Sequence, residues 1–150
     1  MKAANPYLNF NGNTEDAFNF YRTVFGGEFL GMLRYRNFGD NAMQAPEGDL
    51  DKIAHVALPL GNTNILMGTD VLESLGQTLT VGNNVFFNLE ADSDEEAERL
   101  FNALAAGGRI AMQLEKTEWA EKYGVCTDQF GVQWMGNYTG DVQFPGSGGS

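Results

Sequence analysis

Two stretches of the chain share one order of apolar and polar positions. Each runs from the end of an alternating segment, through apolar residues spaced three and four apart, to a pair of glycines; they cover residues 10–29 and 89–110. Alternation with a period of two predicts a strand, and the wider spacing predicts an amphipathic helix. Paired glycines are typical of helix ends because glycine readily adopts left-handed backbone angles. The chain is therefore expected to contain the same strand–helix unit twice.

The two predicted helices also share their start signals. Asn13 or Thr14 is expected to cap the first helix, and Ser93 with Glu96 forms a capping box at the second. Adding 80 to the residue numbers maps Ala17 to Ala97, Tyr21 to Phe101, Val24 to Leu104 and Gly27 to Gly107. This match indicates a duplication, although two unrelated amphipathic helices would share part of it. The stripes are Ala17, Phe18, Tyr21, Val24 and Phe25, then Ala97, Leu100, Phe101 and Leu104.

Three further strands are predicted after each helix. They cover 28–38, 53–61 and 63–70 in the first half, and 109–117, 123–128 and 132–138 in the second. Each half is then β-α-β-β-β, and its single helix covers only one face of its sheet. The predicted class is α+β, with two βαβββ modules whose curved mixed sheets form a cup-shaped cleft and whose helices pack on the outer faces. We expect one domain over 1–144, with modules at about 1–72 and 78–140 and a flexible tail at 145–150.

Charge and composition narrow the classes of partner. The net charge of −11 argues against nucleic acid or an anionic membrane surface as a partner. No apolar run is long enough to span a membrane, and the first ten residues lack a signal-peptide pattern. One cysteine, Cys126, excludes an internal disulfide and favours a cytoplasmic location. The chain is expected to bind neither nucleic acid nor membrane.

Three segments, 6–28, 53–70 and 100–134, resemble the vicinal oxygen chelate superfamily of glyoxalases, bleomycin-resistance proteins and extradiol dioxygenases. The most specific is the last, in which Trp119 is followed by the pairs "YG" and "TD" and then by "FGVQW". More closely, the chain resembles PhnB-like members, often labelled glyoxalase-like or demethylubiquinone methyltransferase. The resemblance implies a homodimer and a ligand cleft. Methyltransferase activity is not expected, because no glycine-rich turn for a nucleotide cofactor follows the first strand.

The resemblance also implies where a divalent metal would be held. Metal-dependent relatives place a His or Glu on each of four strands facing the cleft. Here the four positions fall at Asn5 or Pro6, near Met67, at 84–86 and at Met135. None is a histidine or a carboxylate, so we expect no metal cofactor. A divalent ion bound by residues at other positions is expected only if the protein is an enzyme, the second function considered below.

Two residues are candidates for acid–base chemistry. His55, the only histidine in the sequence, is expected to face the cleft, because Val56 and Leu58 have the parity of the helix-covered face. It is either a proton shuttle and ligand anchor or a hydrogen-bonded residue of the cleft wall. Glu90 has the parity of Asn88 and is either a general base or an ordinary solvated acid before a helix.

The remaining predicted ligand contacts are aromatic, amide and thioether side chains on the same faces. Trp119 and Tyr123 are pocket walls in this interpretation, with core packing or a dimer contact as the alternative. The loop at 39–52 is expected to cover the cleft. The full predicted ligand-binding set is Tyr7, Asn9, His55, Phe86, Asn88, Trp119, Tyr123 and Met135.

Three functions are consistent with these patterns. The first is a homodimeric protein that binds a small molecule without a metal. The second is a glyoxalase-like or lyase-like enzyme that uses His55 and Glu90, or a displaced divalent metal. The third is a structural or interaction module without a pocket.

Overall fold

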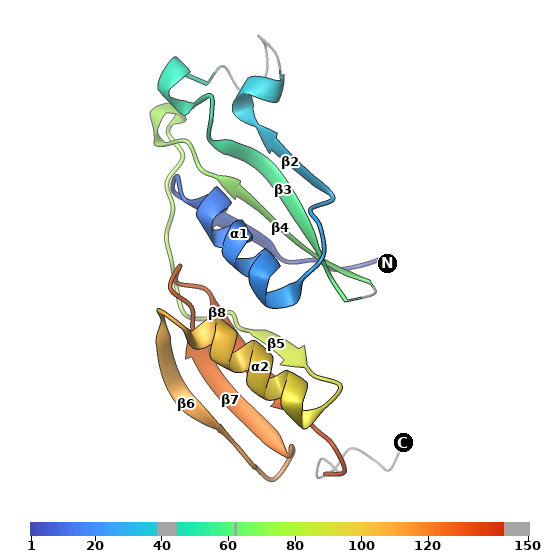
Figure 1. The fold of residues 1–150 in the computed structure, drawn as a ribbon. Coiled ribbons are helices and arrows are strands. Elements are labelled where there is room, and N and C mark those ends of the chain that lie inside the picture. The colour runs from blue at the N-terminus through green and yellow to red at the C-terminus, as the bar shows by residue number, and fades with distance from the viewer. Residues whose placement is uncertain (39–44, 62, 143–150) are drawn as a thin grey trace. The chain divides into compact units, whose positions relative to one another are not determined.

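The computed structural model describes residues 1–38, 45–61 and 63–142. The chain divides into two compact units, Met1–Thr80 and Val81–Ser150. In the described residues each unit contains one α-helix and one four-stranded mixed sheet, which confirms the predicted α+β class and the repeated β-α-β-β-β order (Figure 1). A cup-shaped cleft shared by the modules stays a prediction, and the predicted tail at 145–150 lies outside the described residues.

The first unit contains β1 (Tyr7–Phe10), α1 (Thr14–Phe25), β2 (Gly31–Arg34), β3 (Ile53–Leu60) and β4 (Asn64–Asp70). Its strand order is β1-β4-β3-β2, in which β1 is parallel to β4 and the other pairs are antiparallel. The described residues also form three short 3-10 helices. The first, η1 (Tyr35–Phe38), follows β2; η2 (Glu47–Asp49) precedes β3; and η3 (Glu73–Leu75) follows β4.

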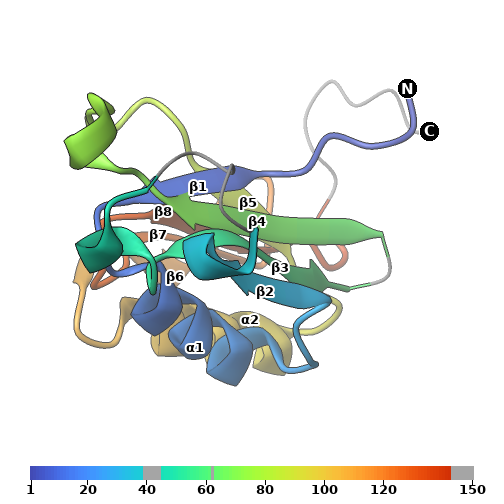
Figure 2. The ribbon, with the colours of Figure 1, turned by 90° about the horizontal axis from the view of Figure 1, so that it is seen from above.

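The second unit contains β5 (Phe87–Glu90), α2 (Asp94–Ala105), β6 (Arg109–Glu115), β7 (Lys122–Thr127) and β8 (Gln133–Tyr138). Its order, β5-β8-β7-β6, is that of the first sheet, again with the first strand parallel to the last. Within each unit the helix lies along one face of its own sheet (Figures 1 and 2).

Of the strand predicted at 28–38, the structure has only Gly31–Arg34. The strand ends at Arg34, where the register with β3 shifts, and the chain continues as η1. The side-chain oxygen of Asn37 accepts a hydrogen bond from the Arg34 backbone N–H at 2.7 Å. Asparagine commonly stabilises turns in this way. Tyr35 and Phe38 therefore project from a helical turn rather than from a strand.

The two helix starts are stabilised differently. Ser93 caps α2 as predicted, because its hydroxyl oxygen accepts from the Glu96 backbone N–H at 3.1 Å. At α1 the cap residue is Asn13, but its side chain makes no capping bond. The buried carboxylate of Asp70 accepts instead from the N–H groups of Gly12 and Thr14, each at 3.0 Å. The first helix is thus capped from the end of β4, which no local pattern predicts.

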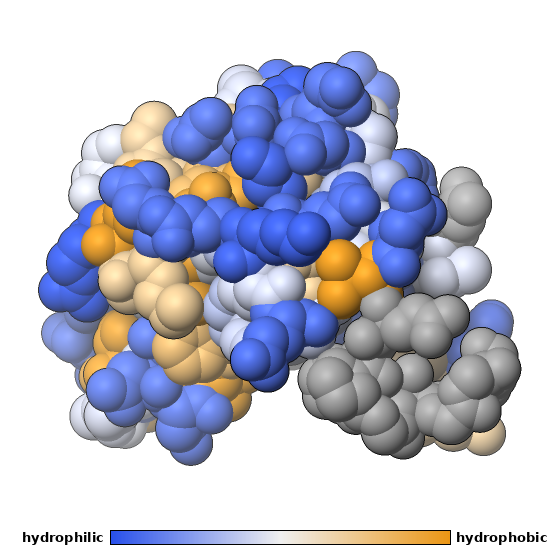
Figure 3. All heavy atoms as spheres, turned by 90° about the horizontal axis from the view of Figure 1, so that it is seen from below, coloured by the Kyte–Doolittle hydropathy of each residue, from blue (hydrophilic) through white to orange (hydrophobic). Residues whose placement is uncertain are grey.

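Each helix buries an aromatic side chain against its sheet. Phe18 is fully buried and packs over Gly68, and Phe101 packs over Gly124 and Gly136. On β3 the buried Val56 and Leu58 face α1, as their parity predicted. Outside the cores, hydrophilic residues surround smaller hydrophobic patches on the face drawn in Figure 3. Among the described residues, no helix has the length and apolar character needed to cross a membrane.

Candidate functional site

The face of the first sheet opposite α1, here called the open face, carries several of the predicted residues. Tyr7 on β1 pairs with Met67 on β4, and Asn9 pairs with Thr69. Met67 in turn pairs with Ala57 on β3. Because side chains alternate between the faces of a strand, these residues lie opposite the helix-covered Val56 and Leu66. The open face therefore has polar and aromatic side chains on neighbouring strands.

Tyr7 and His55 form a direct contact on this face. The Tyr7 hydroxyl lies 3.0 Å from Nδ1 of His55, and the two ring centroids are 5.7 Å apart. Tyr7 is 45% exposed and His55 is half-buried, so the pair remains accessible from solvent. Partial burial raises the pKa of the Tyr7 hydroxyl above its ordinary value, and the nearby Tyr35 raises it further.

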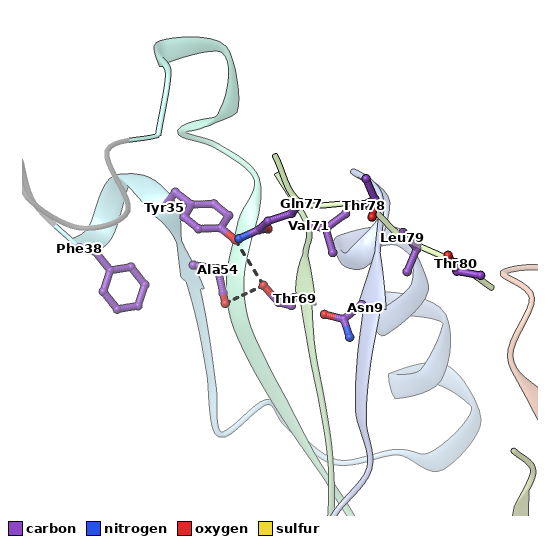
Figure 4. A pocket seen from close by; sticks show the side chains of 10 residues that line it. All are labelled: Asn9, Tyr35, Phe38, Ala54, Thr69, Val71, Gln77, Thr78, Leu79 and Thr80. Carbon is purple, nitrogen blue, oxygen red and sulfur yellow. Dashed lines mark hydrogen bonds between the residues drawn. The ribbon is translucent and has the colours of Figure 1, made fainter. Parts of the chain in front are cut away.

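A cavity of about 780 Å³ opens on the first unit. Its walls come from β1, β3 and β4, from η1, and from the segment that follows η3 (Figure 4). Ligand sites typically combine such a concavity with apolar walls and a few polar groups. The lining residues are Asn9, Tyr35, Phe38, Ala54, Thr69, Val71, Gln77, Thr78, Leu79 and Thr80.

Hydrogen bonds fix part of the cavity wall. The Tyr35 hydroxyl donates to the backbone oxygen of Asp70 at 2.8 Å, and the Thr69 hydroxyl donates to that of Ala54 at 2.9 Å. The side-chain oxygen of Gln77 accepts from the Leu72 N–H at 2.7 Å. By contrast, the side chain of Asn9 makes no hydrogen bond within the described part of the chain. Asn9 is therefore free to contact a ligand.

Sequence reasoning identified Asn9 but missed most of the cavity. Tyr35 and Phe38 lie in the strand predicted at 28–38. Residues 71–80 have no apolar periodicity from which a role in lining a cavity could be predicted. The aromatic pair within the polar run "YRNF" was the available signal. Tyr7 and His55 share the open face but are not among the lining residues.

The predicted covering loop at 39–52 is described only in part, because 39–44 lie outside the described residues. In the remainder, the carboxylate of Asp49 in η2 accepts a hydrogen bond from the Ser74 hydroxyl in η3 at 2.5 Å. Asp49 also forms an ion pair with Lys52 at 2.8 Å. The bond with Ser74 joins the segment before β3 to the segment after β4. Whether the loop covers a ligand stays a prediction.

Four predicted residues of the second unit share the face of the sheet opposite α2: Asn88, Glu90, Tyr123 and Met135. Asn88 pairs with Met135, while Tyr123 and Glu90 both pair with Asn137. The Tyr123 hydroxyl donates to Sδ of Met135 at 3.1 Å. The ring of Trp119 lies edge-on to that of Tyr123, with centroids 5.1 Å apart. Phe86 lies just before β5 and is 40% exposed.

Glu90 is engaged by its neighbours. One carboxylate oxygen accepts from the side-chain amide of Asn137, and the other accepts from the Thr139 backbone N–H at 3.2 Å. These bonds tie the end of β5 to β8 and to the residue that follows it. Its role as a general base stays a prediction.

The residues at the family's metal positions do not fit a divalent ion. Met67 on β4 pairs with Tyr7 on β1, and Met135 on β8 pairs with Asn88 on β5. Thioether, phenol and amide groups are poor ligands for the hard or borderline ions that carboxylate and imidazole sites bind. Across the described ranges, no group of three His, Cys, Asp or Glu side chains is placed to hold a metal.

Comparison with known proteins places the chain in a family. The model of the family described as 3-demethylubiquinone-9 3-methyltransferase matches residues 2–135. Protein YjdN of Escherichia coli K12 is 33% identical over 135 residues, covering 88% of this chain and 92% of its own. These matches extend over nearly the whole chain.

Solved structures agree with this placement. Protein PA1353 from Pseudomonas aeruginosa is 39% identical, with a TM-score of 0.80 over 92% of this chain and 98% of its own. A protein from Bacillus cereus, named a putative 3-demethylubiquinone-9 3-methyltransferase and PhnB protein, is 27% identical, with a TM-score of 0.65 over 90% and 98%.

The wider fold is that of a glyoxalase/bleomycin resistance protein/dioxygenase family enzyme from Burkholderia phytofirmans. That structure is 20% identical, with a TM-score of 0.60 over 89% of this chain and 96% of its own. The chain therefore belongs to the family described as 3-demethylubiquinone-9 3-methyltransferase, and it shares its fold with the Bacillus cereus PhnB protein and with the glyoxalase/bleomycin resistance protein/dioxygenase family enzyme.

Proposed function

We propose that this protein binds a small organic molecule on the open face of its first sheet, without a metal ion. The cavity of about 780 Å³, to which Asn9 and Thr69 of the open face contribute, carries this proposal. Its walls combine aromatic, aliphatic and uncharged polar side chains, the mixture typical of small-molecule sites. The thioethers at two metal positions, Met67 and Met135, support binding that does not depend on a metal.

A ligand screen tests this function. Compounds from a metabolite and antibiotic library that raise the melting temperature are retested on Ala54→Leu, which places extra volume in the cavity. Ala106→Leu, at an exposed position beyond α2, is the matched control. The stabilisation should be lost in the first variant and retained in the second. Hits that stabilise both variants equally would place binding elsewhere, and a screen without hits would favour a structural module.

We further propose that the protein acts as a homodimer in the cytoplasm. Tyr7 is 45% exposed and Leu33 is 41% exposed, and both lie on the open face. A second copy that covers such apolar side chains would gain the free energy of their burial. Size-exclusion chromatography with light scattering should give twice the monomer mass of 16.4 kDa. A single monomer peak at micromolar concentration would contradict the dimer.

An acid–base enzyme is the second candidate, and the Tyr7–His55 contact favours it. When the Tyr7 hydroxyl donates to Nδ1, the neutral imidazole carries its proton on Nε2 and can donate it to a substrate oxygen. Elemental analysis of protein purified without chelator separates this candidate from one that uses a displaced metal. Stoichiometric metal that is lost in His55→Ala would favour the metal enzyme and contradict metal-independent binding.

Methyl transfer is not proposed, although the family description names a methyltransferase. The turn after β1 consists of Asn11, Gly12 and Asn13, with one glycine. A nucleotide cofactor in the Rossmann manner needs a glycine-rich turn that opens a helix near its phosphates.

A further inference from the structure

The polar side chains that line the cavity are all uncharged. No Lys, Arg, His, Asp or Glu occurs among its lining residues as described, and the whole chain carries a net charge of −11. An ionised group that enters the cavity loses hydration free energy, and no oppositely charged side chain among the lining residues offsets this loss. An anion is additionally repelled by the field of the protein. The cavity therefore disfavours both carboxylate and ammonium ligands.

Asn9 differs from the other polar groups of the sheet wall. The hydroxyl protons of Tyr35 and Thr69 are already donated to backbone oxygens, so these residues offer a ligand mainly lone pairs. The carboxamide of Asn9 offers an N–H donor and a carbonyl acceptor side by side. It projects from β1 next to Thr69, the register partner of Asn9 on β4 (Figure 4). A planar group with the complementary pair would form two parallel hydrogen bonds with it.

We infer that the ligand is an uncharged molecule with a carboxamide-like edge that pairs with Asn9 and an apolar or aromatic body that packs near Tyr35 and Phe38. This inference rests on the proposed function and names its ligand class. Tyr35 is buried and fixed by its hydrogen bond, whereas Phe38 is 47% exposed at the rim. Flat aromatic surfaces of this kind suit a planar ligand.

Three isosteric probes test the charge preference. Benzamide, benzoate and benzamidine have the same shape but are neutral, anionic and cationic near neutral pH. Titration of each into ¹⁵N-labelled protein, followed at the backbone amides of Asn9, Thr69 and Thr78, gives site-specific dissociation constants. Benzamide should bind at least about fivefold more tightly than either ion, which is a difference of roughly 1 kcal/mol.

A variant that introduces a negative charge tests the role of Asn9. Asn9→Asp keeps the shape and replaces the donor with a negative charge, so an amidinium gains two charge-assisted hydrogen bonds. Benzamidine should then bind more tightly than benzamide. Asn19→Asp, at an exposed position on α1, adds the same charge away from the cavity and should keep the wild-type order.

The outcomes separate the inference from the proposed function. If none of the probes shifts the cavity amides at tens of millimolar, the cavity is not a binding site and both fail. If benzoate or benzamidine binds the wild type as tightly as benzamide, the function stands and the uncharged class is wrong. If Asn9→Asp leaves the order unchanged, the pairing with Asn9 is wrong.

Discussion

The hydroxyl of Tyr7 lies 3.0 Å from Nδ1 of His55, and this contact spans a strand. Tyr7 belongs to β1 and His55 to β3, while β4 lies between them in the sheet. The contact therefore passes over the open face near Met67, which pairs with Tyr7 in register. It fixes the imidazole through a group far away in sequence.

Removing the Tyr7 hydroxyl should change the tautomer ratio of the His55 ring and have only a small effect on the free energy of unfolding. Tyr7→Phe is expected to alter the free energy of unfolding by less than about 1 kcal/mol, because the lost hydrogen bond is partly solvent-exposed. The ratio of the Nδ1–H and Nε2–H tautomers of the neutral ring should change, because Nδ1 loses the partner whose hydrogen bond favours one of them. Imidazole ¹⁵N chemical shifts measure this tautomer ratio. Tyr138→Phe in the second unit is the control, and an unchanged ratio in Tyr7→Phe would contradict the contact.

Asp70 should be among the most sensitive positions of the first unit. Its buried carboxylate accepts from the N–H groups of Gly12, Thr14 and Ile53 and from the Thr14 hydroxyl. Asp70→Asn turns one acceptor into a donor that faces another donor. We expect a loss of roughly 2–4 kcal/mol in the free energy of unfolding, measured by urea denaturation.

The exposed Asp51, which pairs with Arg36, is the matched control for Asp70. Its side chain is 77% exposed, so Asp51→Asn should change stability by less than about 0.5 kcal/mol. Equal effects of the two substitutions would show that the carboxylate of Asp70 does not cap α1.

Gly68 should not tolerate a methyl group. A Cβ at this position would lie 2.6 Å from a ring carbon of Phe18, which is fully buried under the sheet. Gly68→Ala should therefore destabilise the protein by roughly 1–3 kcal/mol. Gly136→Ala in the second unit should cost less, because its closest contact, with Phe101, is 3.3 Å.

A second substitution tests the cause of the Gly68 effect. Phe18→Leu removes the ring carbon that the new methyl group meets, so the double variant should lose less stability than the two single variants added together. Thermal denaturation of all four proteins gives this coupling. Strict additivity would show that the cost of Gly68→Ala does not come from the contact with Phe18.

The fold could be predicted where the signals are local. Both helices follow from their apolar stripes, and the Ser93 hydroxyl caps α2 as expected, although the Glu96 carboxylate accepts from the Asp92 N–H and not from that of Ser93. The face of β3 followed from the parity of Val56 and Leu58, which are fully buried. These features depend on residues within one or two turns of each other. Pattern reasoning recovers them for that reason.

The cavity could not be predicted, because its walls depend on contacts between distant segments. Asn37 converts the expected end of a strand into η1, which moves Tyr35 and Phe38 into the wall. Gln77 is held by its bond to the backbone of Leu72, in a segment with no apolar period. Only Asn9 was assigned from the strand alternation alone.

Cys126 gives a prediction on pH dependence. Burial raises the pKa of its thiol to about 11, and the negative charge of Asp128 contributes in the same direction. The folded state therefore keeps the thiol proton at a pH where the unfolded chain, with a thiol pKa near 9.0, has lost it. This contribution to stability is complete below about pH 9 and is lost as the pH rises toward 11.

Urea denaturation at about pH 8 and about pH 10 measures this effect against Cys126→Ala. The wild type should lose roughly 1 kcal/mol more than the variant between the two values, because about one pKa unit of the shift is sampled there. The thiol is fully buried, so it should also react with a disulfide reagent only as fast as the protein opens. Equal pH dependence of the two proteins, together with rapid labelling of the native state, would show that Cys126 is accessible and its pKa is not raised.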